Sequence, residues 1–229
     1  MTTFPLMLFA AGMGTRMRPL TDALPKPLIP VAGRPLIDHA LTLARATGCA
    51  PIVVNTHYLA DLITAHLAGQ DIRLNHEPVL LETGGGLRAA LPLLGSGPVM
   101  ILNSDAVWTG LNPLTQLAQV WDAQRMDGLL LTLPAPKATG YQGAGDFRMD
   151  TQGHLTRARG QPADVYLGAQ ILTTKALLAI PDRVFSLNLL WDQMIDRNRL
   201  FGLHHQGGWC DVGRPDSLPM AEALLRGTS

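Results

Sequence analysis

The chain has 229 residues, of which 47% are hydrophobic and 16% charged, and its 18 basic and 18 acidic side chains leave a formal net charge of zero. This composition provides enough apolar side chains for a substantial core and excludes a disordered chain. Because the charges balance, we expect neither nucleic acid nor an anionic membrane as a partner, and anion binding must come from a few placed residues. Two cysteines exclude a disulfide framework of more than one bridge.

The start of the chain has no basic leader, and its first apolar run, residues 6–10, is too short for a signal peptide or a membrane span. We therefore expect a cytoplasmic protein with reduced thiols. The length fits one large domain. We expect a monomer or small homo-oligomer that acts on small-molecule substrates.

The residues that follow this first run organise the chain. Residues 6–10 predict a buried strand, which breaks into Gly12-x-Gly14, a turn that lets backbone N–H groups approach an anion. Arg16 and Lys26 add positive charge. The loop between them is restricted by three prolines, so Lys26 is expected on a stiff segment: Pro19, Pro25 and Pro27. A strand, a glycine turn and a fixed cation together suit a polyphosphate.

The common glycine motifs fit this stretch poorly. A P-loop requires Gly-x-x-x-x-Gly-Lys-Ser/Thr, which the chain lacks, and a dinucleotide fingerprint requires a third glycine where Met17 stands. The mismatch excludes an NAD-binding oxidoreductase as the leading interpretation. An ordinary strand-to-helix loop is the structural alternative.

Beyond this loop, apolar spacing alternates between strand and helix periods. Strands are predicted at 51–55, 72–77, 99–102 and 129–133, and helices at 36–44, 59–67, 87–94 and 114–121. Such alternation indicates βαβ units, an α/β fold and a mainly parallel sheet. Residues 1–136 would then form a nucleotide-binding core.

The pattern changes after Pro136. Glycines divide the chain into short predicted strands at 146–150, 155–158 and 165–173, followed by helices at 187–195 and 215–225. We expect antiparallel strands laid over the core, so that residues 137–229 form a substrate-covering elaboration within one domain.

Two further features suggest ligand contacts. Residues 81–86, Leu-Glu-Thr-Gly-Gly-Gly, predict a turn at a strand-to-helix junction, where backbone could meet a nucleobase. Asp105 follows a central strand, where a carboxylate is well placed to hold Mg²⁺, and Asp211 lies between Trp209 and the glycine at 213. The alternative is that both aspartates cap the turns or helices that follow them.

The motif spacing resembles a known family. Residues 12–26 meet every fixed position of the signature G-x-G-T-R-x-x-P-L-T-x-x-x-P-K of sugar-1-phosphate nucleotidyltransferases. Residues 81–86, 103–105, 143–147 and 209–213 look like the L-E-T-G-G-G, N-x-D, G-x-G-D-F and W-x-D-V-G segments of N-acetylmuramate-1-phosphate uridylyltransferases, single-domain enzymes of peptidoglycan recycling. The resemblance implies a Rossmann-like doubly wound fold, a nucleoside triphosphate (UTP in this branch), Mg²⁺ and release of pyrophosphate.

The resemblance also assigns roles by position. The implied catalytic residues are Arg16, Lys26 and Asp105, and the implied metal ligands are Asp105 and Asp211. The implied nucleotide contacts are Ala11, Gly12, Met13, Gly14, Thr15 and Lys26, with Glu77 and Gly84 at the base. The implied sugar contacts are Asn103, Gly143, Asp146 and Gly168.

The chain departs from the family pattern at two places. Ser104 stands where relatives often have glycine, and residues 157–162 replace a Glu-Lys-Pro segment whose lysine meets the sugar phosphate. Alternative acceptors therefore stay open: glucose 1-phosphate, mannose 1-phosphate, or phosphocholine with CTP. A non-catalytic regulator that binds a nucleotide sugar is the alternative of another class. If the acceptor is a muramate, its lactyl carboxylate requires a cation or N–H donors, for which the candidates are Arg148, Arg157 and Arg159.

Overall fold

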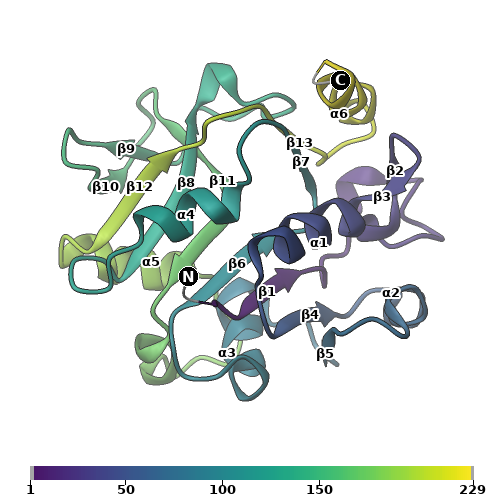
Figure 1. Ribbon diagram of the computed structural model, residues 1–229, viewed down its shortest axis with the longest axis horizontal. Helices are drawn as coiled ribbons and strands as arrows, with labels where there is room; N and C mark the ends of the chain where they lie inside the picture. Colours follow the sequence, from purple (N-terminus) through teal and green to yellow (C-terminus); the bar gives the residue numbers. More distant parts are fainter. Residues whose placement is uncertain (1–2, 228–229) are drawn as a thin grey trace.

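The structure is a computed structural model that describes residues 3–227. Within these residues, one nine-stranded mixed sheet runs through the molecule and helices cover both of its faces (Figure 1). Its strands are β1 (Leu6–Phe9), β4 (Ile52–Thr56), β5 (Arg73–His76), β6 (Val99–Asn103), β8 (Gly128–Pro134), β9 (Phe147–Met149), β10 (Leu155–Arg157), β11 (Asp164–Leu172) and β12 (Leu200–His204). The helices are α1 (Leu36–Thr47), α2 (Ala60–Leu67), α3 (Glu82–Leu94), α4 (Pro113–Val120), α5 (Asn188–Asp196) and α6 (Ser217–Arg226).

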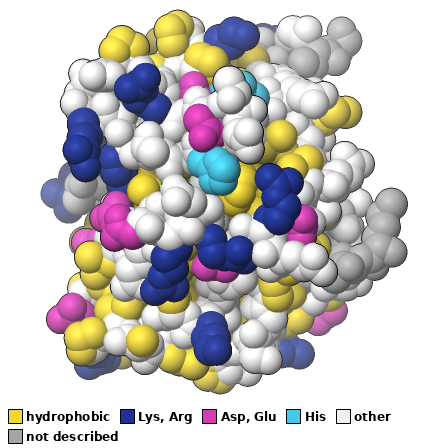
Figure 2. Space-filling view, turned by 90° about the vertical axis from the view of Figure 1, so that its left-hand side faces the viewer, with side chains coloured by type: hydrophobic (Ala, Val, Ile, Leu, Met, Phe, Trp, Pro, Cys, Tyr) yellow, Lys and Arg dark blue, Asp and Glu magenta, His cyan; other side chains and the backbone are white. Residues whose placement is uncertain are grey.

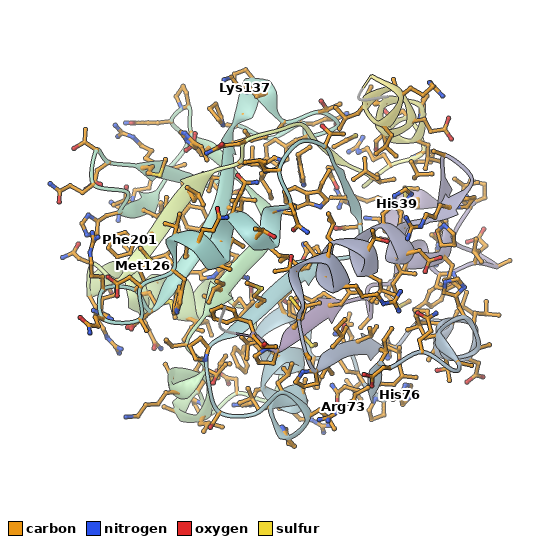
Figure 3. All side chains as sticks on the ribbon, in the orientation of Figure 1. His39, Arg73, His76, Met126, Lys137 and Phe201 are labelled. Atoms are coloured by element: carbon orange, nitrogen blue, oxygen red, sulfur yellow. The ribbon has the colours of Figure 1, made fainter. Side chains whose placement is uncertain are left out.

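Strand alternation builds one core on each face of the sheet. From β1, Leu6 and Leu8 enter the core shared with α1 and α4, whereas Met7 enters the core shared with α3 and α5. Phe201 in β12 and Arg73 in β5 mark opposite ends of the sheet (Figure 3). No helix in residues 3–227 is long and apolar enough to cross a membrane.

The first half of the sheet matches the sequence prediction. Strands β5, β4, β1 and β6 lie side by side and are all parallel. Their carboxyl ends therefore lie at one edge, where ligands bind in open parallel sheets. The predicted α/β fold with a mainly parallel sheet is confirmed.

The second half differs from the expected covering layer. Strand β11 lies inside the main sheet, antiparallel to both β6 and β8, and β12 extends the sheet beyond β8. The strand is almost entirely buried, as a central strand must be, but an apolar run does not reveal which strand is its neighbour. The short hairpin of β9 and β10 lies at an edge of the sheet, where β9 pairs with the start of β11.

The glycine run at 84–86 is also different from the predicted turn, because α3 already begins at Glu82. The N–H groups of Gly84 and Gly85 both donate to the carbonyl of Phe185, at 2.9 and 3.1 Å. A Cβ on Gly84 would collide with the Phe185 ring, and one on Gly86 would come within 2.6 Å of the Glu77 carboxylate. These glycines therefore permit close packing against α3, which outweighs their poor helix propensity.

Two small sheets complete the fold. One pairs β2 (Pro30–Val31) with β3 (Arg34–Pro35), after the signature loop. The other pairs β7 (Ala106–Trp108) with β13 (Trp209–Asp211), with Asp211 opposite Ala106. This second pair was not predicted, and it joins segments about a hundred residues apart in the sequence beside the carboxyl edge of the main sheet.

Candidate active site

A pocket of about 270 Å³ opens at the carboxyl ends of β1, β4 and β6. It is lined by residues from the signature loop, from the start of α3 and from the end of β6: Phe9, Ala10, Ala11, Gly12, Lys26, Pro27, Asn55, Glu77, Leu80, Glu82, Thr83, Asn103, Ser104 and Asp105. Of the predicted nucleotide contacts, Ala11, Gly12, Lys26 and Glu77 line this pocket. Met13, Gly14 and Thr15 lie in the same loop but outside this lining.

The glycine turn is folded back onto the later part of the loop. Gly14 has a φ of +61°, and its carbonyl accepts a 2.8 Å hydrogen bond from the Thr21 hydroxyl. A Cβ on Gly14 would approach the Thr21 side chain to 2.9 Å and Lys26 to 3.2 Å. Tyr58 in turn donates to the Thr21 carbonyl. The turn therefore packs against the segment that carries Lys26, which supports the expectation of a stiff loop.

Lys26 is paired with Asp105. The ammonium Nζ lies 2.7 Å from Oδ2 of Asp105, and only 9% of Lys26 is exposed. Burial alone would raise the pKa of the Asp105 carboxyl, but the charge and hydrogen bond of Lys26, together with the charge of Arg16, hold that pKa below its usual value. Asp105 is thus kept ionised beside the pocket.

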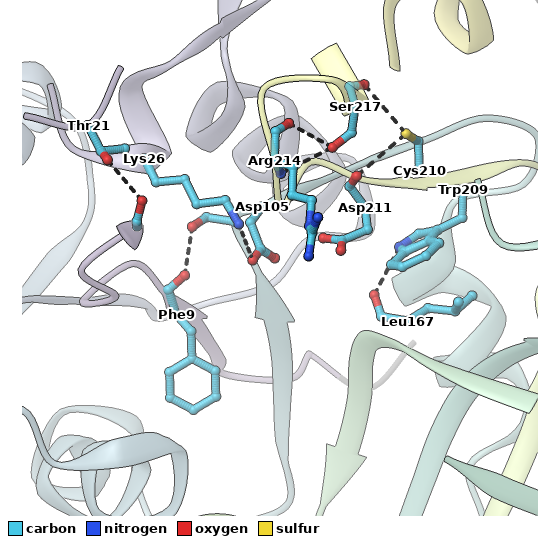
Figure 4. Close-up of polar contacts among 12 residues, drawn as sticks. Phe9, Thr21, Lys26, Asp105, Leu167, Trp209, Cys210, Asp211, Arg214 and Ser217 are labelled. Carbon is cyan, nitrogen blue, oxygen red and sulfur yellow. Dashed lines mark hydrogen bonds and ion pairs between the residues drawn. The ribbon is translucent and has the colours of Figure 1, made fainter. Parts of the chain in front are cut away.

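Asp211 lies next to this pair (Figure 4). The β7–β13 pairing brings it there, and the N–H of Val212 donates to the Asp105 carbonyl at 2.9 Å. Burial and the Asp105 charge raise the pKa of Asp211, against the opposing charges of Lys26 and Arg16. Within residues 3–227 no hydrogen bond is donated to the Asp211 carboxylate. Two repelling carboxylates, one without a donor, form a set of hard oxygen ligands that suits Mg²⁺.

Glu77 anchors a buried network at the pocket floor. Its two carboxylate oxygens accept from the Asn55 amide at 2.7 Å and from the Leu81 N–H at 3.0 Å. The Asn55 carbonyl oxygen accepts from the Ala10 N–H at 2.8 Å. Asn55 therefore joins the start of the signature loop to the residue assigned to the base. Sequence reasoning missed Asn55, because a polar residue ending a buried strand was the only available signal.

Ser104 does not project towards Asp105 as a free hydroxyl. It is 3% exposed, and its hydroxyl donates to the Phe9 carbonyl at 2.7 Å. The side chain therefore ties the ends of β1 and β6 together.

The predicted sugar contacts fall into two groups. Asn103 ends β6, and Gly168, with a φ of +85°, packs on it: a Cβ there would lie 2.9 Å from the Asn103 side chain. The pairing of β11 with β8 is irregular between Tyr166 and Gln170, as at a β-bulge, which often lies near an active site. Asp146 accepts from the Tyr166 N–H at 2.9 Å, so it is fixed beside the same strand.

Gly143 is covered by the side chain of Tyr141. A Cβ on Gly143 would collide with the Tyr141 phenol, so this glycine makes room for the ring. Burial raises the pKa of Tyr141, as do the charges of Asp146 and Asp211, so the phenol lies within electrostatic range of both carboxylates. Tyr141 was not among the predicted site residues, and no spacing pattern marks it.

Tyr166 was also missed. Its hydroxyl is buried and has no hydrogen-bond partner that the structure describes. Burial and the charges of Asp105 and Asp146 raise its pKa, whereas the nearby Gln170 side chain lowers it, so the phenol lies within electrostatic range of both carboxylates. Its ring packs edge-to-face on Trp191 of α5, with centroids 5.0 Å apart.

Known proteins share this sequence and fold. A family model described as a MobA-like NTP transferase domain matches residues 6–166. The N-acetylmuramate alpha-1-phosphate uridylyltransferase of Caulobacter vibrioides is 39% identical over 232 aligned positions, covering 96% of this chain and 96% of that protein. Its namesake from Neisseria meningitidis serogroup B is 33% identical, over 95% of this chain and 96% of that protein.

Among solved structures, a putative glucose-1-phosphate thymidylyltransferase from Bacillus anthracis has the same fold, with a TM-score of 0.82 at 17% identity, over 99% of this chain and 97% of that one. Both sequence matches extend over nearly the whole chain. The chain therefore belongs to the MobA-like NTP transferase family and is a sugar-1-phosphate nucleotidyltransferase.

Proposed function

We propose that this enzyme joins UTP to N-acetylmuramate α-1-phosphate, releasing pyrophosphate, in cytoplasmic peptidoglycan recycling. The observation that carries the reaction type is the meeting of Lys26, Asp105 and Asp211 beside the glycine turn. The two relatives described above, named for this reaction, support the choice of substrates. A non-catalytic regulator would have no need to retain both carboxylates and the lysine.

The triphosphate is assigned to the signature loop. Backbone N–H groups of residues 11–15 would approach its oxygens, as in other glycine-rich anion sites. Lys26 and Arg16 supply the positive charge, and Lys26 is already fixed by its ion pair. The base is assigned to the part of the pocket lined by Leu80, Glu82 and Thr83.

The roles at the base follow from occupied hydrogen bonds. Both oxygens of Glu77 already accept donors, and the Gly84 N–H already serves Phe185. We therefore propose that Glu77 shapes the floor of the pocket and that Gly84 holds the loop around Phe185, the 185 loop, against α3. Glu82 has a φ of +61°, an uncommon backbone conformation for a residue with a side chain, and such strain clusters at binding sites. It is the residue we place nearest the base.

Asp105 and Asp211 are the residues that would hold Mg²⁺. The ion would supply a positive charge shared by the α-phosphate and the sugar phosphate. On the acceptor side, we assign the sugar to Asn103, Asp146 and the bulge at Gly168, and to Tyr141, whose ring covers Gly143. The sugar would thus lie against β11, away from the signature loop.

The reaction needs no protein nucleophile. A phosphate oxygen of the sugar 1-phosphate attacks the α-phosphorus of UTP, and the bond from that phosphorus to the bridging oxygen breaks as pyrophosphate leaves. Two anions must meet, so the residues act by positioning and by neutralising charge. Lys26 and Arg16 stabilise the charge that develops on the leaving pyrophosphate.

The test is a matrix of pyrophosphate-release rates. Four nucleoside triphosphates are each combined with the 1-phosphates of N-acetylmuramate, N-acetylglucosamine, glucose and mannose, and CTP is also combined with phosphocholine. We expect the highest kcat/KM for UTP with N-acetylmuramate 1-phosphate, and only with Mg²⁺ added. A preference of about tenfold for another pair would assign another acceptor, and no turnover with any pair would favour the regulatory alternative.

A further inference from the structure

The proposed acceptor carries a charged group that needs a partner of its own in the site. N-acetylmuramate is N-acetylglucosamine with a lactyl ether on O3, which adds one carboxylate. The acceptor side of the site already holds Asp105, Asp211 and Asp146, so a further carboxylate there requires a cation. Three arginines lie on or beside the β9–β10 hairpin, and the structure distinguishes among them.

Arg157 lies at the end of β10, at the outer end of a row of aromatic rings. Its guanidinium carbon is 4.9 Å from the centre of the Phe147 ring and 5.7 Å from that of Trp191. Trp191 contacts Tyr166, and the charges of Asp105 and Asp146 raise the pKa of that tyrosine. The strand pairing places Arg157 near the acceptor side: Arg157 lies opposite Phe147 in the β9–β10 hairpin, and the next residue, Ala158, donates its N–H to the Asp146 carbonyl at 3.0 Å.

The guanidinium is fixed but still has donors to offer. Nε donates to Asp192 at 2.7 Å and Nη2 donates to the Asn188 carbonyl at 3.2 Å. Arginine has five N–H donors, so two on Nη1 and one on Nη2 are left over from these bonds. That remaining edge is the end-on fork, which binds a carboxylate through two parallel hydrogen bonds. Asp192 and the two rings fix the orientation of the guanidinium plane before any ligand binds, which reduces the conformational entropy lost on binding.

The other two arginines are placed less favourably. Arg148 is exposed and donates to the Gln161 amide at 2.8 Å. Arg159 is exposed and has no ion pair or ring contact with residues 3–227. Arg157, by contrast, has a side chain that is 27% exposed and borders a depression of about 610 Å³. Its charge also reaches Asp146: burial raises the pKa of that carboxyl, and Arg157 opposes the rise.

The surface around this depression is not a general anion site. The face of the molecule that carries β9, β10 and α5 shows basic side chains interspersed with acidic ones (Figure 2). Asp192 and Asp196 line the depression together with Arg157 and Arg159. A single oriented fork, not a basic patch, is therefore the feature that could select a carboxylate.

We propose that Arg157 receives the lactyl carboxylate of the acceptor and thereby selects N-acetylmuramate 1-phosphate over N-acetylglucosamine 1-phosphate. The inference rests on the proposed function and names one residue that determines its acceptor specificity. The structural alternative is that Arg157 only pins β10 to α5 through Asp192.

The experiment compares the two acceptors, which differ only in the lactyl group, at saturating UTP. Arg157→Gln should lower kcat/KM for N-acetylmuramate 1-phosphate by about 10- to 100-fold, mainly through KM, and change it by less than about threefold for N-acetylglucosamine 1-phosphate. Arg157→Lys keeps the charge but not the fork, and should give an intermediate loss. Arg125→Gln is the matched control, because Arg125 also lies over a ring, Phe201, at 5.4 Å, but at the β12 edge. It should leave both rates unchanged.

Equal losses for both acceptors would overturn the inference and leave Arg157 as a structural pin. The same is true if Arg148→Gln, and not Arg157→Gln, changes the ratio. If Arg157→Gln lowers the melting temperature too far for assay, the ratio measured with Arg157→Lys decides. A wild-type enzyme that prefers the muramate, with an unchanged preference in the Arg157 variants, refutes this inference alone. A wild-type enzyme without that preference refutes the proposed function as well.

Discussion

The two sides of the active site are built in different ways. On the nucleotide side, the parallel strands β1, β4 and β6 deliver the signature loop, Asn55 and Asp105 to one edge of the sheet. On the acceptor side, the antiparallel strand β11 and the β9–β10 hairpin bring together Asp146, Tyr166 and Arg157 from separate segments. Much of the nucleotide side thus lies in one continuous stretch of sequence, the signature loop. The acceptor side, by contrast, combines side chains from several separate segments.

This difference predicts separate effects on the two substrates. Changes on the nucleotide side should slow the reaction with every acceptor, because they remove charge that acts on the triphosphate. Changes on the acceptor side should alter the choice of acceptor or the packing. Variants on each side test that division.

Changes to the two carboxylates that we propose as metal ligands should give the largest losses. Asp105→Asn and Asp211→Asn should each reduce Mg²⁺-dependent kcat by about 10³-fold or more, whatever the acceptor. Their stabilities should differ. Asp105→Asn leaves the buried Lys26 without its counter-charge and should lower the melting temperature, whereas Asp211→Asn removes a repelling charge and should not. Steady-state kinetics and thermal unfolding check both points, and normal turnover in either variant would contradict the two-carboxylate site.

Lys26→Ala should lower kcat/KM by about 10²-fold for all acceptors, because one preorganised charge contact with the transition state is lost. Lys137→Ala is the control: this lysine is exposed on the 3₁₀ turn Ala135–Lys137 (Figure 3) and is not among the residues that line the pocket. A kcat/KM for Lys26→Ala within a few-fold of the wild-type value, or a loss confined to one acceptor, would contradict the assignment of Lys26 to the triphosphate.

Gly84→Ala tests the packing of the 185 loop on α3. The new Cβ meets the Phe185 ring, so we expect a loss of about 1–3 kcal/mol in the free energy of unfolding, measured with urea. Gly97→Ala is the matched control, since a Cβ there meets nothing within 4 Å. If both glycine variants unfold at the same urea concentration, the close packing described for Gly84 is wrong.

Tyr166→Phe should have the smallest effect on stability. Its hydroxyl is buried without a partner, so removing it should leave the free energy of unfolding unchanged or raise it by up to about 1 kcal/mol. Thermal unfolding is the measurement. A clear loss of stability would show that the hydroxyl makes a hydrogen bond in solution.

The same division explains what the sequence could and could not predict. Lys26 was placed correctly at the pocket, because glycines and prolines restrict the local backbone whatever surrounds it. The position of β11 was not predicted, because an apolar run does not specify its neighbours in a sheet. The helical start at Gly84–86 was not predicted, because the small size of Gly84 serves a contact with Phe185, about a hundred residues away.

Side chains that act through distant contacts were the hardest to predict. Tyr141 and Tyr166 acquire their neighbours, among them Asp211 and Trp191, only through the tertiary fold, and so does Asn55, which pairs with Glu77. The pairing of β7 with β13 is the clearest case. It brings Asp211 beside Asp105, and two short strands separated by about a hundred residues carry no periodic signal of that pairing.

We propose that Asp105, just before β7, and Asp211, at the end of β13, each contribute one carboxylate to a single metal site. Mn²⁺ binding in the presence of saturating UTP, followed by electron paramagnetic resonance against a blank of UTP alone, tests it most directly. We expect Asp105→Asn and Asp211→Asn each to weaken the enzyme-dependent Mn²⁺ binding by about tenfold or more, and the double variant to be little worse than either. Wild-type Mn²⁺ affinity in Asp211→Asn, or two losses that simply add, would contradict a shared site.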